Sequence, residues 1–400
     1  MNTTIESGLA NQLIPTEAEL IQRAKNMIPT LIARADACEK ARMVPPETVK
    51  EFEEAGFFNI VRPKALGGYE MSPHVFYKVL HEIGRGCGSS AWVLMVIGIH
   101  NWEMALFPEQ ASQDLWGKDP NAKTSSSYHP WGKVERVEGG YLMNGTWRFS
   151  SGCDHCTWAI LGGMIFNKET GAVEDNRVML VPRTDYTISD NWYVFGLAGS
   201  GSKDLILENV FVPEHRTHSL LDCFNMVDAE KRNPLYRTSF GNTFSFAVAS
   251  VMIGIAQGAI DVYIEQMRVR TNTMDGSKTG LSPYVRDRLG HASSKVRGAK
   301  ARLAAAMAEM EKTIAEGRQI PMMDRANYKW DAGRIGRDAE EAVHLLYKAT
   351  AARGTMLSNP IQRFLRDALV GSNHITLNAD DSAGNAGGVM LGAETTDLVL

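Results

Sequence analysis

Two hydroxyl-rich clusters stand at the two ends of one short stretch of the chain. Residues 124–128 read Thr-Ser-Ser-Ser-Tyr, and residues 147–155 read Trp-Arg-Phe-Ser-Ser-Gly-Cys-Asp-His. Serine hydroxyls can hydrogen-bond the polar edge of a flat heteroaromatic ring, and Trp147 and Trp158 add broad apolar faces nearby. A flavin would suit such a wall, whereas ordinary solvated strand ends are the plain alternative from composition alone.

The residues around these clusters carry the period of two that is typical of strands. The turn pair Asn144-Gly145, between the segments 141–143 and 146–149, predicts a hairpin. Further strand-like segments are 133–138, 158–166, 177–182, 186–190, 191–195 and 203–211. We therefore expect a central β domain, a small barrel or sandwich at residues 118–222, that presents both hydroxyl clusters.

Two other motifs in this region invite a chemical interpretation. The glycine-rich segment 196–202 meets neither the G-x-x-x-x-G-K-[ST] pattern nor a G-x-G-x-x-G between a strand and a helix, so it is interpreted as a flexible connection beside a site. The Cys153-Asp154-His155-Cys156 cluster has no second ligand pair at zinc-like spacing. We predict no metal site.

A predicted helix at 90–106 supplies the next candidate residues. It is apolar on nearly all sides, as a helix buried between layers would be, and it carries His100 and Trp102 near its end. Together they would give a pocket a polar tip and an aromatic wall, although a satisfied packing histidine is the plainer interpretation. Other segments of helical period lie at 16–38, 46–55 and 73–83. These segments predict an N-terminal helical domain at 1–117.

After a polar linker, the chain is helical almost to its end. Four long segments of helical period lie at 244–271, 282–316, 324–353 and 359–374. This is the number that an antiparallel four-helix bundle needs, and we assign it to residues 223–400. The fold class is therefore α+β, with unlike layers that leave a crevice where they meet.

Composition and charge argue against several classes of binding partner. The formal net charge of the 400 residues is −4 and the Lys and Arg positions are scattered, which argues against nucleic acid and against a polybasic membrane anchor. Five cysteines form no secreted disulfide framework, and the N-terminus lacks the features of a signal peptide, so we expect a cytoplasmic protein. The uncharged run 238–260 contains Asn and Gln and predicts a buried helix rather than a membrane span.

Several motifs, in one order, carry a resemblance over nearly the whole chain. The domain order, with Arg366-Asp367-Ala368 in the last core helix, resembles the acyl-CoA dehydrogenase fold. Within that fold the detail is similar to the oxygenase components of two-component flavin-dependent aromatic monooxygenases, the family of p-hydroxyphenylacetate 3-hydroxylase and of the hydroxylase of phenolic secosteroids. The matching segments are 98–102, 125–128, 150–155, 191–193, 201–202 and 360–364.

The resemblance implies a complete reaction system. A homotetramer would take reduced FMN or FAD from a separate NAD(P)H:flavin reductase, react it with dioxygen to a C4a-hydroperoxyflavin, and hydroxylate a small phenolic or related aromatic substrate. The choice between FMN and FAD stays open, because the loop before Pro360 is shorter than in the steroid enzyme and an arginine of some relatives is replaced near Gly241.

The resemblance also implies roles for individual residues. Ser151 would face flavin N5, Ser126 and His100 would orient the substrate, and His374 would accept a phenolic proton as a general base. Arg270 would bind the flavin phosphate across a subunit boundary, opposite the loop 354–358. The implied catalytic residues are His100, Ser126, Ser151 and His374. The implied cofactor contacts are Ser126, Trp147, Ser150, Ser151, Arg270, Thr355 and Ser358. The implied substrate contacts are His100, Trp102, Ser126, Tyr128 and His374.

Two other functions remain open on this scaffold. An acyl-CoA dehydrogenase or oxidase needs a carboxylate base, commonly after the Arg-Asp-Ala element, and this chain has no Asp or Glu between Asp367 and Asp380. A base placed elsewhere would rescue that alternative. A non-catalytic binding protein is the third possibility, because fold does not fix function.

Overall fold

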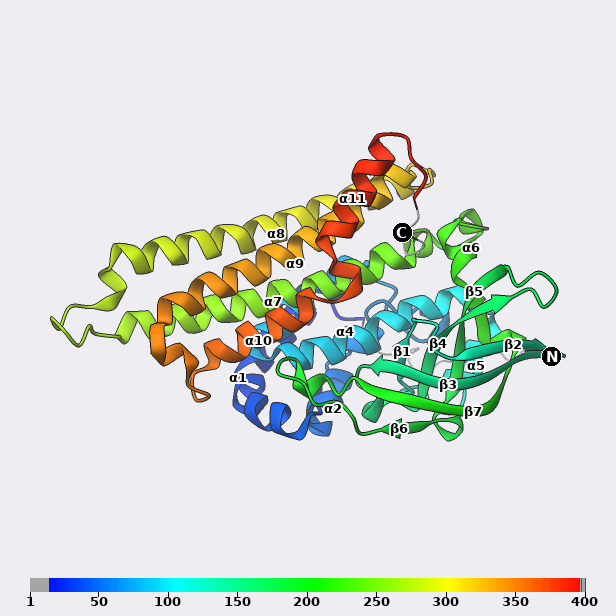
Figure 1. Ribbon diagram of the computed structural model, residues 1–400, viewed down its shortest axis with the longest axis horizontal. Helices are drawn as coiled ribbons and strands as arrows, with labels where there is room; N and C mark the ends of the chain where they lie inside the picture. Colours follow the sequence, from blue (N-terminus) through cyan, green and yellow to red (C-terminus); the bar gives the residue numbers. More distant parts are fainter. Residues whose placement is uncertain (1–13, 396, 398–399) are drawn as a thin grey trace.

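The structure, a computed structural model, describes residues 14–395, 397 and 400. Helices form most of its length, and the strands gather at one end (Figure 1). The N-terminal helices are α1 (Glu17–Ala41), α2 (Pro46–Glu54), α3 (Pro73–Gly86), α4 (Gly88–Glu103) and α5 (Glu109–Trp116). Every residue of α4 is buried, because this helix packs against α3, α7 and strand β1. The expectation of a helix between layers is confirmed.

Eight strands form two four-stranded sheets. Their order is β1-β4-β5-β8 in one sheet and β2-β3-β7-β6 in the other, and β1 runs parallel to β4. The strands are β1 (Thr124–Ser127), β2 (Lys133–Val137), β3 (Gly140–Ser150), β4 (Trp158–Phe166), β5 (Val173–Pro182), β6 (Thr187–Ser189), β7 (Lys203–Pro213) and β8 (Thr217–Ser219). The segment 191–195, expected to be a strand, is irregular in the structure.

The glycine-rich segment 196–202 is not the flexible connection that the sequence suggested. All its residues are buried, and it contains the short helix η6 (Ala198–Ser200). Asp367 accepts a hydrogen bond of 2.6 Å from the backbone N–H of Leu197, which adopts a left-handed conformation at φ 49°. A carboxylate 170 residues away therefore fixes this segment.

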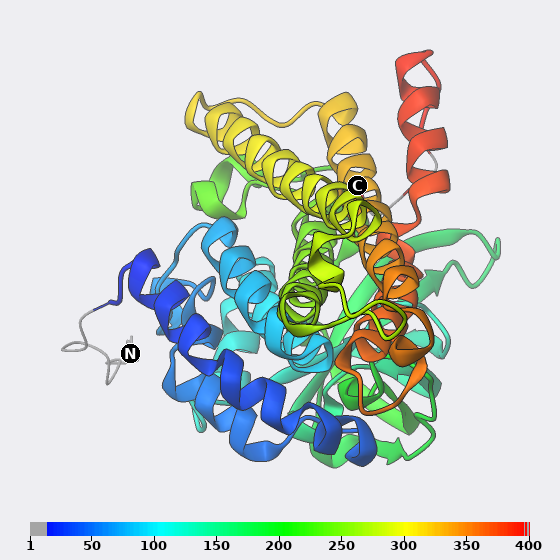
Figure 2. The same cartoon turned by 90° about the vertical axis from the view of Figure 1, so that its left-hand side faces the viewer.

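The C-terminal half is helical. It contains α6 (Leu220–Phe224), α7 (Phe240–Val269), α8 (Pro283–Ala315), α9 (Met322–Thr350), α10 (Pro360–Ser372) and α11 (Ala379–Met390). Four of these match the four predicted bundle helices, whereas α11 was not predicted; it packs against α9 and projects from the bundle (Figure 2). By length and composition α7 could span a membrane, but 94% of its apolar window is buried inside the protein, as in a core helix.

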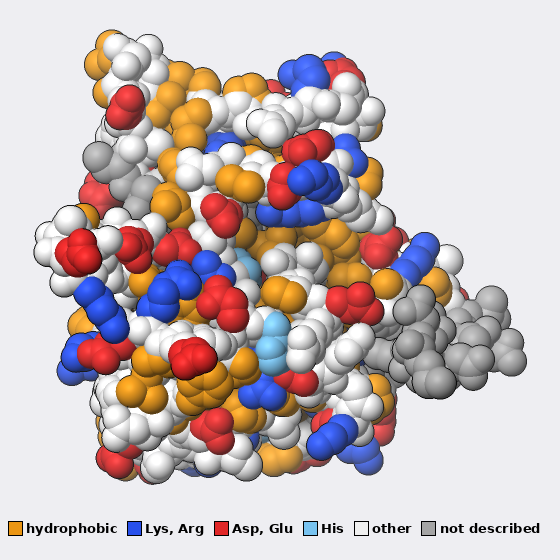
Figure 3. All heavy atoms as spheres, turned by 90° about the vertical axis from the view of Figure 1, so that its right-hand side faces the viewer, with side chains coloured by type: hydrophobic (Ala, Val, Ile, Leu, Met, Phe, Trp, Pro, Cys, Tyr) orange, Lys and Arg blue, Asp and Glu red, His pale blue; other side chains and the backbone are white. Residues whose placement is uncertain are grey.

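The surface carries no single sign of charge on the face that includes the ends of the strands. Acidic and basic side chains are interspersed there, with hydrophobic side chains visible between them (Figure 3). The buried helix α4, in contrast, lies between strand β1 and the bundle helix α7, and it carries the candidate residue His100.

Candidate active site

The end of α4 and the short strand β1 bring the first two predicted residues together. His100 is fully buried, and its Nε2 lies 2.7 Å from the Oγ of Ser126, which is 8% exposed. On its other side, Nδ1 of His100 lies 3.0 Å from Oε2 of Glu103, one helical turn further along α4. The order of groups is therefore hydroxyl, imidazole and carboxylate.

The carboxylate of Glu103 is the centre of a larger buried network. Its Oε2 also accepts a short hydrogen bond from the hydroxyl of Tyr128, and its Oε1 lies 3.0 Å from Nε2 of His218 on β8. Burial alone would raise the pKa of Glu103, but hydrogen bonds from His100 and His218 lower it to about 2. Glu103 is thus ionised in the folded protein.

Two aromatic side chains join the remaining predicted residues to this network. The ring of Phe244 on α7 lies 5.9 Å from the ring of His100 and 5.9 Å from the ring of His374. The ring of Trp92 meets His374 edge-on at 5.5 Å, and the indole N–H of Trp92 donates to Ser151 Oγ at 3.1 Å. His100, Ser126, His374 and Ser151 therefore belong to one cluster.

The surroundings of His374 argue against the expected role as a base. The backbone N–H of Thr376 donates to its Nδ1 at 3.3 Å, and the Thr376 hydroxyl, 2.9 Å from the same nitrogen, can donate there too. The neutral ring therefore carries its proton on Nε2. Burial and the charge of Lys329 lower its pKa to about 4. The one acceptor nitrogen is thus engaged by the backbone, and the ring has an N–H to offer instead. Thr376 and Lys329 also line an open pocket of about 640 Å³.

Ser151 and Ser150 differ although they are neighbours. Ser151 Oγ, besides its bond from Trp92, lies 2.7 Å from the hydroxyl of Ser202. Ser150 is fully buried, and its hydroxyl donates to Ser125 Oγ at 2.9 Å. The structure therefore corrects the expectation for Ser150, whose side chain is enclosed between β3 and β1 of the two sheets.

Two predicted tryptophans are also core residues. Trp147 is fully buried between the two sheets, and its indole N–H donates to the carbonyl of Gly162 at 2.7 Å. It is therefore not the expected flavin wall. Trp102 is fully buried as well, its N–H donates to the carbonyl of Leu235 at 3.0 Å, and its ring stacks on Phe240. Trp102 thus lies one layer behind the side chains around His100.

The three predicted phosphate-binding residues lie far from this cluster. Arg270 caps the C-terminal end of α7, where its guanidinium donates to the carbonyl of Thr350 at 3.3 Å. Thr355 and Ser358 are exposed at the same end of the bundle, opposite the strands in Figure 1. Along α7, the rise of about 1.5 Å per residue puts Arg270 about 39 Å from Phe244. One flavin cannot reach both regions of the same chain.

The residues around Ser151 fit the ring of a flavin. Phe149 is 58% exposed, and its ring meets that of Trp192 edge-on at 6.2 Å. Tyr193 and Phe195 follow in the same segment and are 72% and 58% exposed. Exposed aromatic faces beside a hydroxyl group suit a planar ring that has an apolar body and a polar edge.

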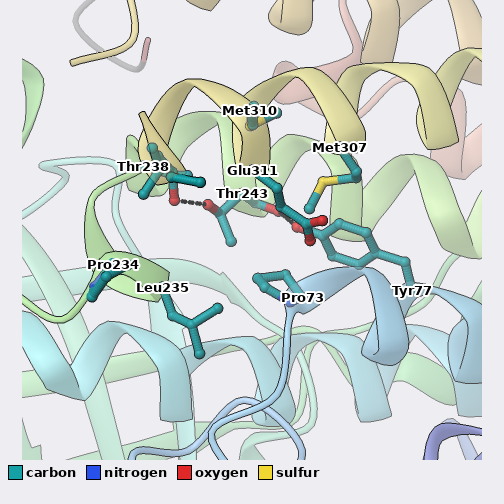
Figure 4. A pocket seen from close by; sticks show the side chains of 11 residues that line it. Pro73, Tyr77, Pro234, Leu235, Thr238, Thr243, Met307, Met310 and Glu311 are labelled. Carbon is teal, nitrogen blue, oxygen red and sulfur yellow. Dashed lines mark hydrogen bonds between the residues drawn. The ribbon is translucent and has the colours of Figure 1, made fainter. Parts of the chain in front are cut away.

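A second pocket is separate from the cluster. It is apolar, has a volume of about 200 Å³ and lies between α3 and α8 (Figure 4). Tyr77 and Leu235 line it, and the Tyr77 hydroxyl donates to the carbonyl of Thr243 at 2.7 Å. None of the predicted site residues lines this pocket.

Four residues of the cluster were missed in the sequence: Trp92, Glu103, His218 and Phe244. Glu103 had a signal, because it is the one Asp, Glu, Lys or Arg between residues 88 and 103 and lies three positions after His100. His218 had none, since its partner is 115 residues away.

Comparison with known proteins identifies the family. Models of the acyl-CoA dehydrogenase N-terminal and C-terminal domains match residues 15–116 and 246–379. The oxygenase subunit HsaA of a flavin-dependent monooxygenase from Rhodococcus jostii (strain RHA1) is 36% identical, over 88% of this chain and 93% of that protein. The oxygenase component of p-hydroxyphenylacetate 3-hydroxylase from Acinetobacter baumannii is 32% identical, over 94% of this chain and 89% of that protein.

Solved structures agree. The 3-HSA hydroxylase from Rhodococcus sp. RHA1 superposes with a TM-score of 0.89 at 34% identity, covering 96% of this chain and 99% of the other. XiaF from Streptomyces sp., in complex with FADH2 and glycerol, superposes with a TM-score of 0.88 at 26% identity, covering 95% and 97%. The fold class and the resemblance are confirmed, and the monooxygenase interpretation is favoured over the acyl-CoA dehydrogenase. This chain belongs to the family of oxygenase components of flavin-dependent monooxygenases, built on the acyl-CoA dehydrogenase fold.

Proposed function

We propose that this chain hydroxylates a small phenolic substrate with dioxygen and reduced flavin. One observation carries the proposal: the hydroxyl of Ser126 lies 2.7 Å from Nε2 of a buried histidine whose other nitrogen faces a carboxylate. Such an arrangement can receive the proton of a substrate hydroxyl beside Ser126, which makes the ring carbon next to that oxygen more nucleophilic.

One end of the cluster binds the substrate and the other end binds the flavin. His100 and Ser126 hold the substrate hydroxyl, and Tyr128 closes the pocket beside them. Ser151 offers its hydroxyl to the edge of the flavin ring, and His374 donates its remaining N–H rather than accepting a proton. Phe244 and Trp92 fill the space between these polar groups and exclude water.

The bound flavin supplies the activation of dioxygen. FMN and FAD, each in its reduced form, are both candidates, and a separate NAD(P)H:flavin reductase delivers them. The exposed ring of Phe149 stacks against the flavin ring, and Trp192, which meets Phe149 edge-on, borders it. Arg270 and the loop that carries Thr355 and Ser358 hold the phosphate of a flavin bound mainly by another copy of the chain.

This last assignment requires an assembly. The distance of about 39 Å between Arg270 and Phe244 along α7 supports an assembly in which two copies complete each site, and the homotetramer that the family resemblance implies would provide it. We also propose that the protein is cytoplasmic and that residues 1–117, 118–222 and 223–400 are its three domains.

The test supplies reduced flavin without a reductase. The purified chain is mixed anaerobically with chemically reduced FMN or FAD and a panel of phenols, exposed to air, and scored by product mass. We expect a product heavier by one oxygen atom, and no oxidation of NADH by the chain alone, because no dinucleotide-binding fingerprint follows a strand. Rapid NADH oxidation by the chain alone would contradict the two-component assignment.

A further inference from the structure

We propose that Glu103 and His218 form a buried positioning pair, which keeps a proton on Nδ1 of His100 so that this ring exchanges protons only at Nε2. The proposal rests on the proposed function in one respect: the proton that Nε2 receives is that of the substrate hydroxyl, directly or through Ser126. The assignment of the pair itself depends only on the contacts of these side chains.

Glu103 determines which nitrogen of His100 carries the proton. It is fully buried at the end of α4, and an ionised carboxylate can only accept hydrogen bonds. Nδ1 of His100, 3.0 Å from Oε2, must therefore carry a proton in both the neutral and the charged ring. The hydroxyl of Tyr128 lies 2.9 Å from the same nitrogen, but it donates its own proton to Oε2 of Glu103, so toward Nδ1 it can only accept.

His218 supplies the charge that keeps Glu103 ionised. His218 is 6% exposed; its Nε2 lies 3.0 Å from Oε1 of Glu103, and its Nδ1 lies 3.3 Å from the carbonyl oxygen of Ser219 and 3.6 Å from Sγ of Cys223. Both ring nitrogens thus face acceptors. Burial alone would lower the pKa of His218, but the contacts with Cys223 and Glu103 raise it to about 10. His218 is a buried cation.

Glu103 contacts His100 at Nδ1 and His218 contacts Glu103, so neither touches Nε2 of His100 or the hydroxyl of Ser126, the two groups that would meet the substrate. The groups with charge or a titratable proton that face this ring are Glu103 on α4 and Tyr128 after β1; behind them stand His218 on β8 and Cys223 on α6. From α7 the ring meets the uncharged Phe240 and Phe244.

The proton balance of the step is simple. The substrate O–H bond breaks, its electron pair stays on oxygen, and a new N–H bond forms at Nε2. If Ser126 mediates, it gives its own proton to Nε2 and takes that of the substrate. His100 becomes an imidazolium between the phenolate and Glu103, and no oxidant or reductant is consumed. Glu103 therefore favours the charged ring, while His218 opposes it.

Because the two charges act in opposite directions, replacing them should move the pH profile in opposite directions. A merely structural role would not produce these shifts. Glu103→Gln removes the negative charge that favours the charged ring of His100. The rising limb of the hydroxylation pH profile should then move to lower pH, with a plateau at least tenfold lower. His218→Gln keeps a donor toward Glu103 but removes the positive charge, and should move the limb to higher pH. The matched control is Asp114→Asn, which removes a carboxylate from His215 and Arg216 elsewhere on the β domain and should move nothing.

A second measurement does not depend on turnover. In full-length protein with 15N-labelled histidine, His100 should keep its Nδ1 proton throughout a pH titration, with only Nε2 titrating. A bare Nδ1 in the wild-type protein would overturn the proposal, as would pH profiles that stay unmoved in both variants. If no phenol is hydroxylated but Nδ1 remains protonated, the proposed function fails and the positioning pair stands. The titration uses the wild-type chain, so it decides the matter even where a variant does not fold.

Discussion

The rings of His100 and His374 each lie 5.9 Å from the ring of Phe244, and their surroundings differ in almost every respect. His100 presents Nδ1 to the carboxylate of Glu103, whereas His374 presents Nδ1 to the backbone N–H of Thr376. The first nitrogen must carry a proton and the second must not. The two rings therefore hold opposite tautomers, and only His100 has a nitrogen free to receive a proton at the site.

The difference shows that a sequence motif does not determine whether its histidine accepts or donates a proton. The sequence motif around residues 371–374 suggested a general base, but the group that contacts the far nitrogen decides what the near nitrogen can do. In this protein, that group is a backbone amide in one region and a charged side chain in the other.

The largest expected effect separates the two histidines directly. His100→Asn keeps an amide donor toward Glu103 but cannot take up a proton, so hydroxylation at pH 7.5 should slow by about a hundredfold to ten-thousandfold. The measurement is the rate of product formation with excess reduced flavin, with the thermal midpoint as a check on folding. A rate within tenfold of wild type would remove His100 from proton transfer.

His374 should give a much smaller effect. His374→Ala loses one hydrogen-bond donor, worth about 0.5–1.5 kcal/mol, so coupling of oxygen use to product should fall by about twofold to tenfold. His374→Gln, which restores a donor, should recover most of the loss. Coupling is read from hydrogen peroxide released against product formed. A hundredfold loss in the glutamine variant would restore His374 as the base and reverse the comparison.

The adjacent serines test the flavin side of the same cluster. Ser151→Ala should increase peroxide release by about twofold to tenfold with flavin affinity nearly intact, because one hydrogen bond in a dry site is lost. Ser150→Ala is the matched control, since its buried hydroxyl donates to Ser125 of the other sheet and its loss should leave the peroxide yield unchanged. Equal peroxide yields in the two variants would return Ser151 to a packing role.

The smallest expected effect is on stability. Because the folded pKa of His374 is about 4, below the value of about 6.5 for an exposed histidine, its contribution is present above pH 6.5 and is lost as the pH falls toward 4. His218, with a raised pKa, contributes below pH 6.5 and loses this contribution as the pH rises toward 10. The free energy of unfolding, measured by urea titration, should therefore depend less on pH on the acid side in His374→Gln. In His218→Gln it should depend less on pH on the alkaline side. Parallel curves for both variants and wild type would contradict this.

Much of the fold could be predicted from periodicity. The bundle helices and most strands carry regular patterns over many residues, so their positions needed no knowledge of distant partners. The predictions for the segments 191–195 and 196–202 were wrong because the structure there depends on contacts with distant residues. Asp367 holds Leu197 from the other end of the chain, and no local pattern records such a contact.

The site was predictable in part. The four implied catalytic residues do come together, because the motifs that carry them are shared with relatives of the same fold. Trp147 was misassigned because alternation along a strand identifies two faces but not which one packs against the second sheet. The tautomer of His374 could not be predicted from the sequence, because it depends on a backbone amide whose direction only the folded loop defines.

The length of α7 has a genetic consequence. If each site combines His100 of one chain with Arg270 of another, then a His100→Asn chain and a chain that lacks Arg270 each have little activity alone. Assembled together, they would form one site with both residues intact and one with neither. Co-expression of two defective alleles would then restore activity, and a single defective allele would damage sites whose remaining residues come from a normal subunit.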